Sequence, residues 1–229
     1  MKLAVIPARG NSKRIPRKNI KEFAGRPMIA WSIEAAQKAG IFDRIIVSTD
    51  DPEIAKTAKL WGADVPFERP AYLSDDNIGT TPVMSHAIHW HVNNGLDPQD
   101  VCCIYATAPL MQAEDIVRGL EILHSEGAEF AFSVTTYAFP IQRAFTMRDD
   151  GLIEMLDASQ FQVRSQDLQE AYHDAGQFYW GTKAAWLSGK PMFGEYSVPV
   201  ILPRYRVQDI DTAEDWTQAE ALFNAMKSN

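Results

Sequence analysis

The chain contains very little cysteine and no long apolar segment. Its only cysteines, Cys102 and Cys103, are adjacent in a run typical of a strand, so their side chains should point to opposite faces. This excludes a disulfide framework and fits the cytoplasm. No apolar run is long enough to span a bilayer, and Arg9 interrupts the first apolar stretch too early for a signal peptide. We therefore expect no membrane association and a cytoplasmic location.

Positive charge is also scarce over the whole chain. Lysine and arginine number 22 against 30 acidic residues, which gives a formal net charge of −8. Proteins that bind nucleic acids or membrane surfaces need a broad basic field, which this chain lacks. The 229 residues are 46% apolar, as in a folded globular protein. Because no repeat, low-complexity segment or linker divides the sequence, we predict a single domain over residues 1–229.

The positive charge that does occur is concentrated near the N-terminus. Residues 9–21 contain six cations and no acidic residue, namely Arg9, Lys13, Arg14, Arg17, Lys18 and Lys21. A local basic cluster in an acidic chain favours a small anionic ligand. The glycine spacings of a P-loop and of a dinucleotide-binding fingerprint are both absent.

The residue types of this basic loop suit a triphosphate. Gly10, Asn11 and Ser12 can donate hydrogen bonds, while nearby cations can neutralise the phosphate charge. Pro16 restrains the backbone and stiffens the loop. An ordinary solvated loop is the alternative, with Arg14, Arg17 and Lys21 as its solvated members.

Strand-like and helix-like segments alternate along the chain. Strands are predicted at residues 2–7, 44–50, 101–106, 130–136, 176–181 and 196–202, and helices at 27–40, 51–62, 80–94, 114–126 and 211–227. Thr80 or Thr81 can cap the third helix, and Thr212 with Asp215 has capping-box spacing. Alternating strands and helices predict a three-layer α/β/α fold with a mostly parallel sheet. Ligands of such sheets bind at the carboxyl ends of the strands, where the basic loop begins.

The rhythm changes over residues 137–175. Extended segments joined by a turn at residues 149–151 replace the strand–helix alternation. We predict that this stretch departs from the strand–helix order of the rest of the chain.

Two further groups of residues could carry chemistry. Asp209 and Asp211 share one face of an extended segment while Ile210 turns to the core, which suits a Mg²⁺ site, although Asp211 could instead cap the last helix. Residues 164–180 are rich in polar and aromatic side chains. Arg164 could clamp a carboxylate, and the residues just before the strand could read hydroxyl groups, unless the segment is an ordinary polar loop.

Four stretches together resemble the CMP-sugar synthetases, the cytidylyltransferases that activate sialic-acid-like sugars. These stretches are IPARGNSKRIPRKNI, RIIVSTDDPEIA, ERPAYLSDD and DIDTAEDW, within a resemblance that extends from Leu3 to about Phe223. The resemblance implies a Rossmann-like fold of the nucleotide-diphospho-sugar transferase type. It also implies a Mg²⁺-dependent reaction of CTP with a nine-carbon 2-keto acid sugar, which gives a CMP-sugar and diphosphate. An association with flagellin glycosylation comes from the resemblance too.

The resemblance also assigns roles to individual residues. Lys18, Arg9 and Lys13 would be catalytic, with Lys18 at the α-phosphate. The nucleotide would contact Ala8, Arg9, Gly10, Asn11, Ser12, Lys13, Asn19, Arg69 and Thr80. The sugar would contact Gln142, Arg143, Arg164, Tyr172, His173, Asp174 and Gln177. Asp209 and Asp211 would hold Mg²⁺.

Other stretches bear on the sugar and on assembly. CCIYATAPL, FPIQRAF and RSQDLQEAYHDAGQFYWG look most like the branch of the family that acts on pseudaminic acid, with N-acetylneuraminic or legionaminic acid as alternatives. Thr107 stands where a sister branch carries a further metal-binding carboxylate, which leaves the number of metal ions open. By resemblance, residues 137–175 correspond to the family's inserted, protruding dimerisation and sugar-site element, so a homodimer is expected.

Two other functions remain as alternatives. A metal-dependent glycosyltransferase also uses an Asp-x-Asp pair, but usually at the end of a middle strand. A nucleic-acid-binding module could use the basic loop as an arm, although the acidic remainder of the chain opposes this.

Overall fold

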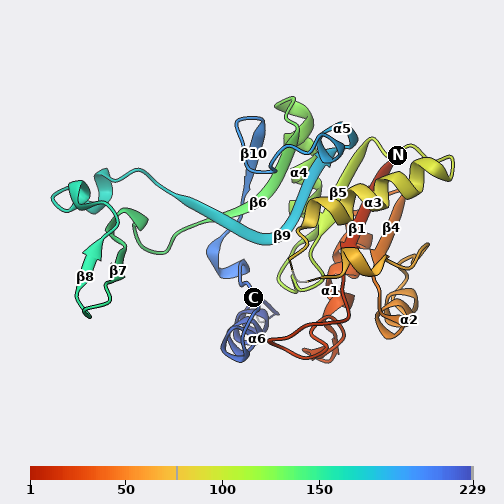
Figure 1. Ribbon diagram of the computed structural model, residues 1–229, viewed down its shortest axis with the longest axis horizontal. Helices are drawn as coiled ribbons and strands as arrows, with labels where there is room; N and C mark the ends of the chain where they lie inside the picture. Colours follow the sequence, from red (N-terminus) through yellow and green to blue (C-terminus); the bar gives the residue numbers. More distant parts are fainter. Residues whose placement is uncertain (76, 228–229) are drawn as a thin grey trace.

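A computed structural model describes residues 1–75 and 77–227 of the chain. Asp76, which ends the ERPAYLSDD stretch, therefore lies outside the described residues. The central sheet has the strand order β10-β6-β9-β5-β1-β4 (Figure 1). Its strands are β1 (Lys2–Pro7), β4 (Arg44–Ser48), β5 (Asp100–Ile104), β6 (Phe130–Thr136), β9 (Tyr172–Thr182) and β10 (Ser197–Ile201).

Helices cover both faces of this sheet. They are α1 (Met28–Ala39), α2 (Pro52–Leu60), α3 (Thr80–Asn93), α4 (Ala113–Ser125), α5 (Lys183–Leu187) and α6 (Ala213–Lys227). Buried residues of α1, α2 and α4 pack with Cys102 on one face, while those of α3 and α5 pack with Cys103 on the other. The three-layer prediction is confirmed, as is the prediction that the two cysteines point to opposite faces.

The sheet is mostly parallel, as predicted, but it contains one antiparallel strand. β1 runs parallel to β4 and β5, and β10 runs parallel to β6, whereas β9 is antiparallel to both of its neighbours. After β6 the chain leaves the sheet at the carboxyl end of this strand, and it re-enters the sheet at the same end as β9. Because no crossover helix carries the chain to the other end of the sheet, β9 runs antiparallel. The alternation of strand-like and helix-like segments did not predict the antiparallel direction of β9, because the segment that leads to β9 is irregular.

β9 also begins earlier than predicted. It starts at Tyr172 rather than at residue 176, and its first residues pair with Val134 to Thr136 of β6. Tyr172, His173 and Asp174 therefore belong to a strand, not to the polar loop that the sequence indicated. Gly176 has φ of +62°, a conformation that favours glycine.

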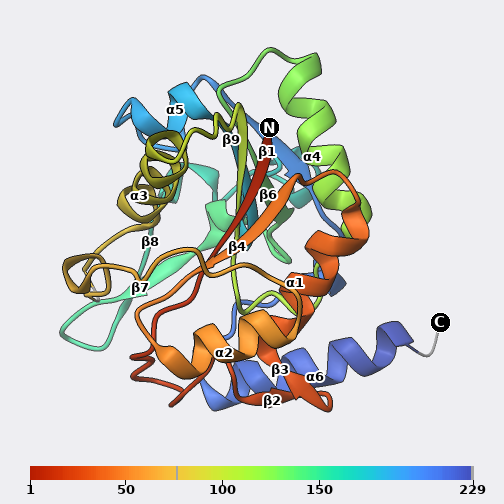
Figure 2. The same cartoon turned by 90° about the vertical axis from the view of Figure 1, so that its right-hand side faces the viewer.

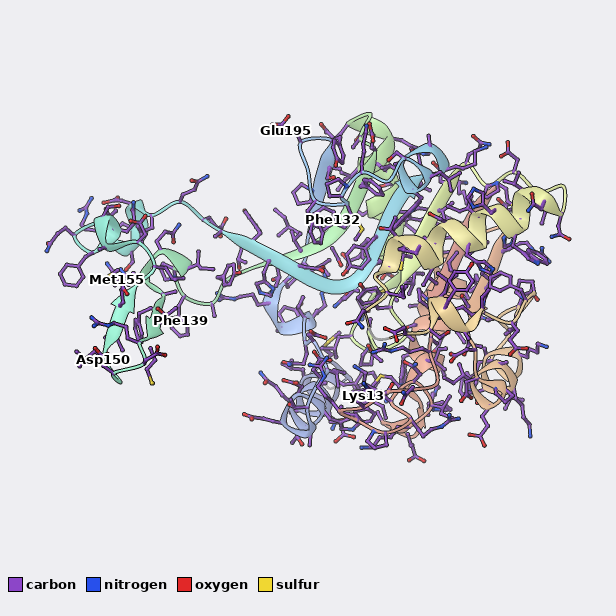
Figure 3. All side chains as sticks on the ribbon, viewed as in Figure 1. Lys13, Phe132, Phe139, Asp150, Met155 and Glu195 are labelled. Carbon is purple, nitrogen blue, oxygen red and sulfur yellow. The ribbon has the colours of Figure 1, made fainter. Side chains whose placement is uncertain are left out.

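An extension projects from the body between β6 and β9 (Figure 1). It carries the antiparallel hairpin of β7 (Phe145–Met147) and β8 (Ile153–Met155), together with three 3₁₀ turns, Ile141–Arg143, Ala158–Gln160 and Ser165–Asp167. Figure 3 shows Phe139, Asp150 and Met155 on this extension, far from Lys13 in the body.

The last helix packs beneath the N-terminal loop (Figure 2). A small hairpin of β2 (Glu22–Phe23) and β3 (Arg26–Pro27) places the Phe23 ring 5.4 Å from the rings of both Trp216 and Phe223 of α6. This third apolar cluster fixes the start of α6 next to the basic loop. No helix in the described part of the chain is long and apolar enough to cross a membrane.

Candidate active site

A cavity of about 440 Å³ lies at the carboxyl ends of β1 and β5. This is the sheet edge where ligands of α/β folds bind. Of the predicted residues, Arg9, Ser12, Lys13, Lys18, Asn19, Arg69, Thr80, Asp209 and Asp211 line it. The fold therefore brings together six of the nine predicted nucleotide residues, Lys18 and both predicted metal residues from four separate parts of the sequence, whereas Ala8, Gly10 and Asn11 do not line the cavity.

The basic loop starts as a direct continuation of β1. The Ala8 N–H donates to the Ser48 carbonyl at 2.9 Å, and the Gly10 N–H donates to Asp50 Oδ1 at 3.0 Å. A Cβ on Gly10 would lie 2.7 Å from Asp51 Oδ2, so only glycine fits here without a shift. The loop is thus held against the end of β4. The Gly10 N–H, which was expected to serve a phosphate, is engaged by Asp50.

Two cations of the loop have structural partners, contrary to the expectation that they are solvated. Arg17, at a φ of +57°, forms a bidentate pair with Asp51 and also contacts Glu53. The Arg17 hydrogen bond holds the pKa of Asp51 below its usual range, and Asp51 also caps α2 by accepting from Glu53 N–H. Lys21 Nζ lies 4.5 Å from the centroid of the Trp216 ring, a cation–π contact. These contacts fix the loop to α2 and α6.

Two buried polar residues form part of the cavity wall. Asn19 is 6% exposed, and its side-chain amide donates to the Arg9 carbonyl at 2.9 Å. Arg69 is 4% exposed and donates to the hydroxyl and carbonyl oxygens of Ser48. Burial lowers the pKa of Arg69 to about 10, so this guanidinium stays charged at neutral pH. The cavity therefore has a fixed, desolvated cation on one side.

Asp209 and Asp211 also line the cavity, with the predicted alternation of side chains. Ile210 between them is fully buried in the Phe23–Trp216 cluster, while both carboxylates line the cavity. α6 has its own capping box, because Thr212 and Asp215 exchange hydrogen bonds through their backbone N–H groups and side chains. Asp211 is therefore available for a role other than a helix cap.

Cations of the basic loop reach this acidic pair. Lys18 Nζ donates to the Ile210 carbonyl at 2.6 Å and lies 3.3 Å from Asp211 Oδ1. Arg14 Nη1 lies 2.8 Å from Asp211 Oδ2. Burial and the nearby charge of Asp211 raise the pKa of Asp209. Arg14 was expected to be solvated; its position in the basic loop was the only sequence signal for its role here.

The wall on the side of β5 carries hydroxyl groups. Thr80, the first residue of α3, lies with its Oγ1 3.0 Å from the Tyr105 hydroxyl, and Gly79 rather than a threonine is the N-cap of that helix. Thr107 also lines the cavity. Among the described residues, no group of three or more His, Cys, Asp or Glu side chains is arranged to hold a metal ion. A cation bound by the aspartate pair would take its other ligands from water and phosphate.

Four of the predicted sugar residues lie along β9, outside the lining of this cavity. The Asp174 carboxylate accepts from the Tyr179 hydroxyl at 2.6 Å, and the Tyr172 hydroxyl donates to Glu170 at 2.7 Å. His173 packs its ring against Tyr137. Gln177 is 3% exposed, and its amide donates to the Arg206 carbonyl at 2.5 Å. Gln177 thus braces the segment that leads to Asp209.

The other three predicted sugar residues lie on the extension. Their side-chain donors are engaged there: Gln142 donates to the Gln169 carbonyl, Arg143 to the Val163 carbonyl and Arg164 to Asp167. The Arg164 side chain is 72% exposed. Within one chain, these residues stay apart from the cavity that collects the nucleotide and metal residues.

Comparisons with known proteins show the family of the chain. The family model described as cytidylyltransferase matches residues 3–226. A pseudaminic acid cytidylyltransferase of Campylobacter jejuni is 44% identical, over 96% of this chain and 95% of that protein. The N-acylneuraminate cytidylyltransferase B of Danio rerio is 35% identical over 95% of this chain, which corresponds to 50% of that larger protein.

A solved structure supports the fold. CMP:2-keto-3-deoxy-manno-octonic acid synthetase complexed with CTP superposes with a TM-score of 0.71 over 98% of this chain and 99% of that one. Its sequence identity of 16% shows the fold alone. The family model covers nearly all of the chain, and a relative well above 30% identity covers it at similar length. The chain therefore belongs to the cytidylyltransferase family.

Proposed function

We propose that this chain transfers CMP from CTP to the anomeric hydroxyl of pseudaminic acid, giving CMP-pseudaminic acid and diphosphate. The observation that carries this proposal is the cavity in which the cations of residues 9–18 face the Asp209/Asp211 pair. The 44% identity to the Campylobacter jejuni enzyme supports pseudaminic acid as the sugar.

The reaction needs positioning and charge stabilisation more than it needs covalent catalysis. The sugar hydroxyl attacks the α-phosphorus, and diphosphate leaves in line with it. In this proposal Arg9, Ser12 and Lys13 hold the triphosphate. Lys18, held by the Ile210 carbonyl, stabilises the charge that develops at the α-phosphate. Its ammonium group is fixed before the substrate arrives, which favours the transition state.

We also propose Mg²⁺ as the cofactor, bound by Asp209 and Asp211. Burial and the like charge of Asp211 raise the pKa of Asp209, and a bound divalent cation would offset both effects on the ionised carboxylate. Carboxylate oxygens are the ligands that Mg²⁺ prefers. When bound, the ion would neutralise phosphate charge. Thr107 lines the cavity in place of a carboxylate, so the proposal assigns the ion to the Asp209/Asp211 pair.

In this proposal cytidine occupies the part of the cavity lined by Asn19, Arg69 and Thr80. The Arg69 guanidinium can only donate hydrogen bonds, which matches the O2 and N3 acceptors of cytosine. Asn19 holds the Arg9 carbonyl, and Thr80 adds a hydroxyl at the start of α3. Ala8, Gly10 and Asn11 complete the residues proposed to bind the nucleotide, and their proposed role is to shape the loop.

We propose that the chain acts as a homodimer in which the extension of each copy covers the other. The extension exposes many large apolar side chains, each more than half accessible: Phe139, Phe145, Met147, Leu152, Ile153, Leu156 and Phe161. A solvent-facing hairpin with such a surface is normally covered by a partner. Docking on a second copy would bring Gln142, Arg143 and Arg164 to a sugar site that a single chain does not assemble.

A direct assay tests the proposed reaction. The full chain is incubated with CTP, Mg²⁺ and each of pseudaminic, legionaminic and N-acetylneuraminic acid, and diphosphate release and product mass are followed. Pseudaminic acid should give the highest kcat/KM. Turnover of another of these sugars alone would overturn the sugar while keeping the class. Release of a nucleoside diphosphate from a nucleotide-sugar would instead favour a glycosyltransferase, and salt-sensitive binding to DNA or RNA would favour a nucleic-acid module.

The location proposed for the enzyme is the cytoplasm. Both free cysteines are fully buried in the two faces of the sheet, which suits a reducing compartment, and the proposed nucleotide substrate is made there. The link to flagellin glycosylation stays a prediction from the resemblance.

A further inference from the structure

The segment between β10 and α6 carries both proposed metal ligands, Asp209 and Asp211. Along it the chain leaves the sheet, forms the 3₁₀ turn Arg204–Arg206 and then reaches the last helix (Figure 1). The backbone of residues 207–211 belongs to no helix or strand. Contacts with the rest of the fold, rather than a ladder of backbone hydrogen bonds, therefore decide where Asp209 lies.

A buried ion pair holds the turn of this segment. Arg206 Nη1 donates to Asp115 Oδ2 at 2.7 Å, and the two side chains are only 18% and 8% exposed. Asp115 lies in the first turn of α4, a helix that packs Ile116 and Leu120 into the core on the sheet. Charge-assisted hydrogen bonds of this kind are short and strong. The side chain of Arg206 is thus tied to a helix that the core holds in place.

A second contact acts on the backbone of the same arginine. Gln177 Nε2 donates to the Arg206 carbonyl at 2.5 Å, and Gln177 is buried within β9. Its own carbonyl accepts from the Tyr105 N–H at 2.9 Å, which fixes this part of the strand. Arg206 is therefore held twice, by its side chain from α4 and by its carbonyl from the sheet.

The other end of the segment has separate anchors. Ile210 is fully buried in the Phe23–Trp216 cluster, and the Asp211 N–H donates to Asp215 Oδ2 at 3.0 Å. Asp209 lies between these anchors and Arg206, whereas Asp211 lies on the side of α6. Loss of the Arg206 contacts should therefore displace Asp209 more than Asp211.

We propose that Asp115 and Gln177 are positioning residues that hold Asp209 in place for metal binding, acting through Arg206. The inference rests on the proposed metal site of Asp209 and Asp211. Asp115, Gln177 and Arg206 do not line the cavity, so they act on the site from behind it. For Gln177, this role differs from the sugar contact that the family resemblance implies.

Two variants remove the two contacts to Arg206 with little change of volume. Asp115→Asn keeps the shape of the side chain but removes the negative charge that Arg206 faces. The largely buried guanidinium then lacks a counter-charge, which favours its movement toward solvent, together with the turn. Gln177→Leu removes the donor to the Arg206 carbonyl.

The test measures Mn²⁺ binding to the full chain by electron paramagnetic resonance, without nucleotide and without sugar. Leaving out the sugar removes any contribution of Gln177 as a sugar ligand. Each variant should bind Mn²⁺ about tenfold more weakly than wild type, as is typical when a residue that orients a metal ligand is lost. A folded variant that binds Mn²⁺ as tightly as wild type overturns the inference.

A double-mutant cycle tests whether Asp115 acts through Asp209. In the Asp209→Asn background, Asp115→Asn should weaken Mn²⁺ binding further by less than about twofold, because the ligand that Asp115 positions is already changed. A purely structural role of Asp115 would instead give the same loss in both backgrounds. Equal losses in the two backgrounds would therefore contradict the proposed role.

A matched control uses the other partner of the same carboxylate. Arg118 Nη2 donates to Asp115 Oδ1 at 2.7 Å and to the Ile201 carbonyl at 2.9 Å, but it does not contact Arg206. Arg118→Ala should therefore keep the Mn²⁺ affinity within about twofold of wild type. A loss as large as that of Asp115→Asn would mean that general loosening of α4, not the contact to Arg206, weakens the site.

Two further checks separate the possible failures. Circular dichroism verifies that each variant is folded, and Gln177→Leu serves alone if Asp115→Asn does not fold. If wild type does not bind Mn²⁺, the proposed metal site fails and the inference fails with it. If wild type binds Mn²⁺ and the folded variants bind it equally well, only the inference fails.

Discussion

At the scale of single residues, the cations of the basic loop do two different things. Arg17 and Lys21 bind groups of the protein itself, and these contacts hold the loop in place. Lys18 and Arg14 instead contact Asp211 of the proposed metal site. In the sequence, charge alone could not distinguish the structural cations from the cations of the proposed site, because the residues that they contact lie more than thirty positions away. The sequence predicted Lys18 by resemblance, but it gave no sign that Arg17 is structural.

Lys18→Ala tests whether this lysine acts in the transition state. The variant should lower kcat by about 100-fold to 1,000-fold while changing the KM for CTP much less, because the lost charge stabilises developing negative charge. Steady-state kinetics with CTP and pseudaminic acid measure both constants. Lys56→Ala on the exposed side of α2 is the control and should match wild type. An unchanged kcat with only a raised KM would contradict the role.

For Asp209 we predict how the stability of the folded protein depends on pH. Its pKa is raised in the folded state, so the folded protein binds more protons there than the unfolded chain does, and stability falls as the pH rises from about 4 toward neutral. Asp209→Asn removes this cost. Without divalent cations, the variant should melt roughly 1–3 °C above wild type at pH 7.

Melting curves over a pH series provide the check for Asp209. The difference between variant and wild type should shrink as the pH falls toward 4, where wild-type Asp209 also becomes neutral. Added Mg²⁺ should stabilise wild type more than the variant. A variant that melts below wild type at pH 7 in the absence of metal would show that the ionised carboxylate is not destabilising.

At the scale of elements, local signals predicted most of the fold. The strand β1, the helices α1 and α2 and the capping box of α6 follow from periodicity, Pro52 and the Thr212/Asp215 spacing. β9 was placed too late and its direction was missed. Its early residues are polar, and they form a strand only because β6 pairs with them. Such pairing between distant segments leaves no local pattern in the sequence.

Gly10→Ala tests how the loop joins the β4–α2 junction. The new Cβ would lie 2.7 Å from Asp51 Oδ2 and 2.9 Å from Asp51 Cβ, so Asp51, Arg17 or the loop has to move. We expect a loss of about 1–3 kcal/mol of stability, typical of overpacking, and weaker CTP binding. Denaturant unfolding and titration with CTP measure the two effects.

The control for this change is Gly79→Ala. A Cβ there meets nothing within 4 Å and the backbone φ of −72° suits any residue, so no overpacking is expected and stability should fall by only about 0.5–1 kcal/mol, the loss typical of alanine at a helix N-cap. Equal stability of the two variants would mean that Gly10 is not restricted by Asp51.

At the scale of the whole molecule, one chain assembles the nucleotide half of the proposed site and holds the other half away from it. Arg143 and Arg164 lie on the extension, while Asp209 lines the cavity of the body. Figure 3 shows the separation of the two parts by Asp150 of the extension and Lys13 of the body. The apolar hairpin on the same extension has no cover within the described part of the chain. The family resemblance predicted a protruding element at residues 137–175, but only the fold shows that it holds these arginines away from the cavity.

Complementation between two inactive variants tests the proposed exchange. Lys18→Ala disables the cavity of its own body, and Arg164→Ala disables the extension. If each extension serves the other copy, a mixed dimer of closed two-fold symmetry has one intact site out of two. Random reassembly of equal amounts makes about half of the dimers mixed. The mixture should therefore recover about a quarter of wild-type kcat. Light scattering on wild type verifies the dimer, and Lys56→Ala mixed with Lys18→Ala should give about half of wild-type kcat with or without subunit exchange, which calibrates the activity of the mixtures. Restoration requires that Arg164 act in trans, because an arginine acting on its own cavity would leave every site of the mixed dimer with one defect.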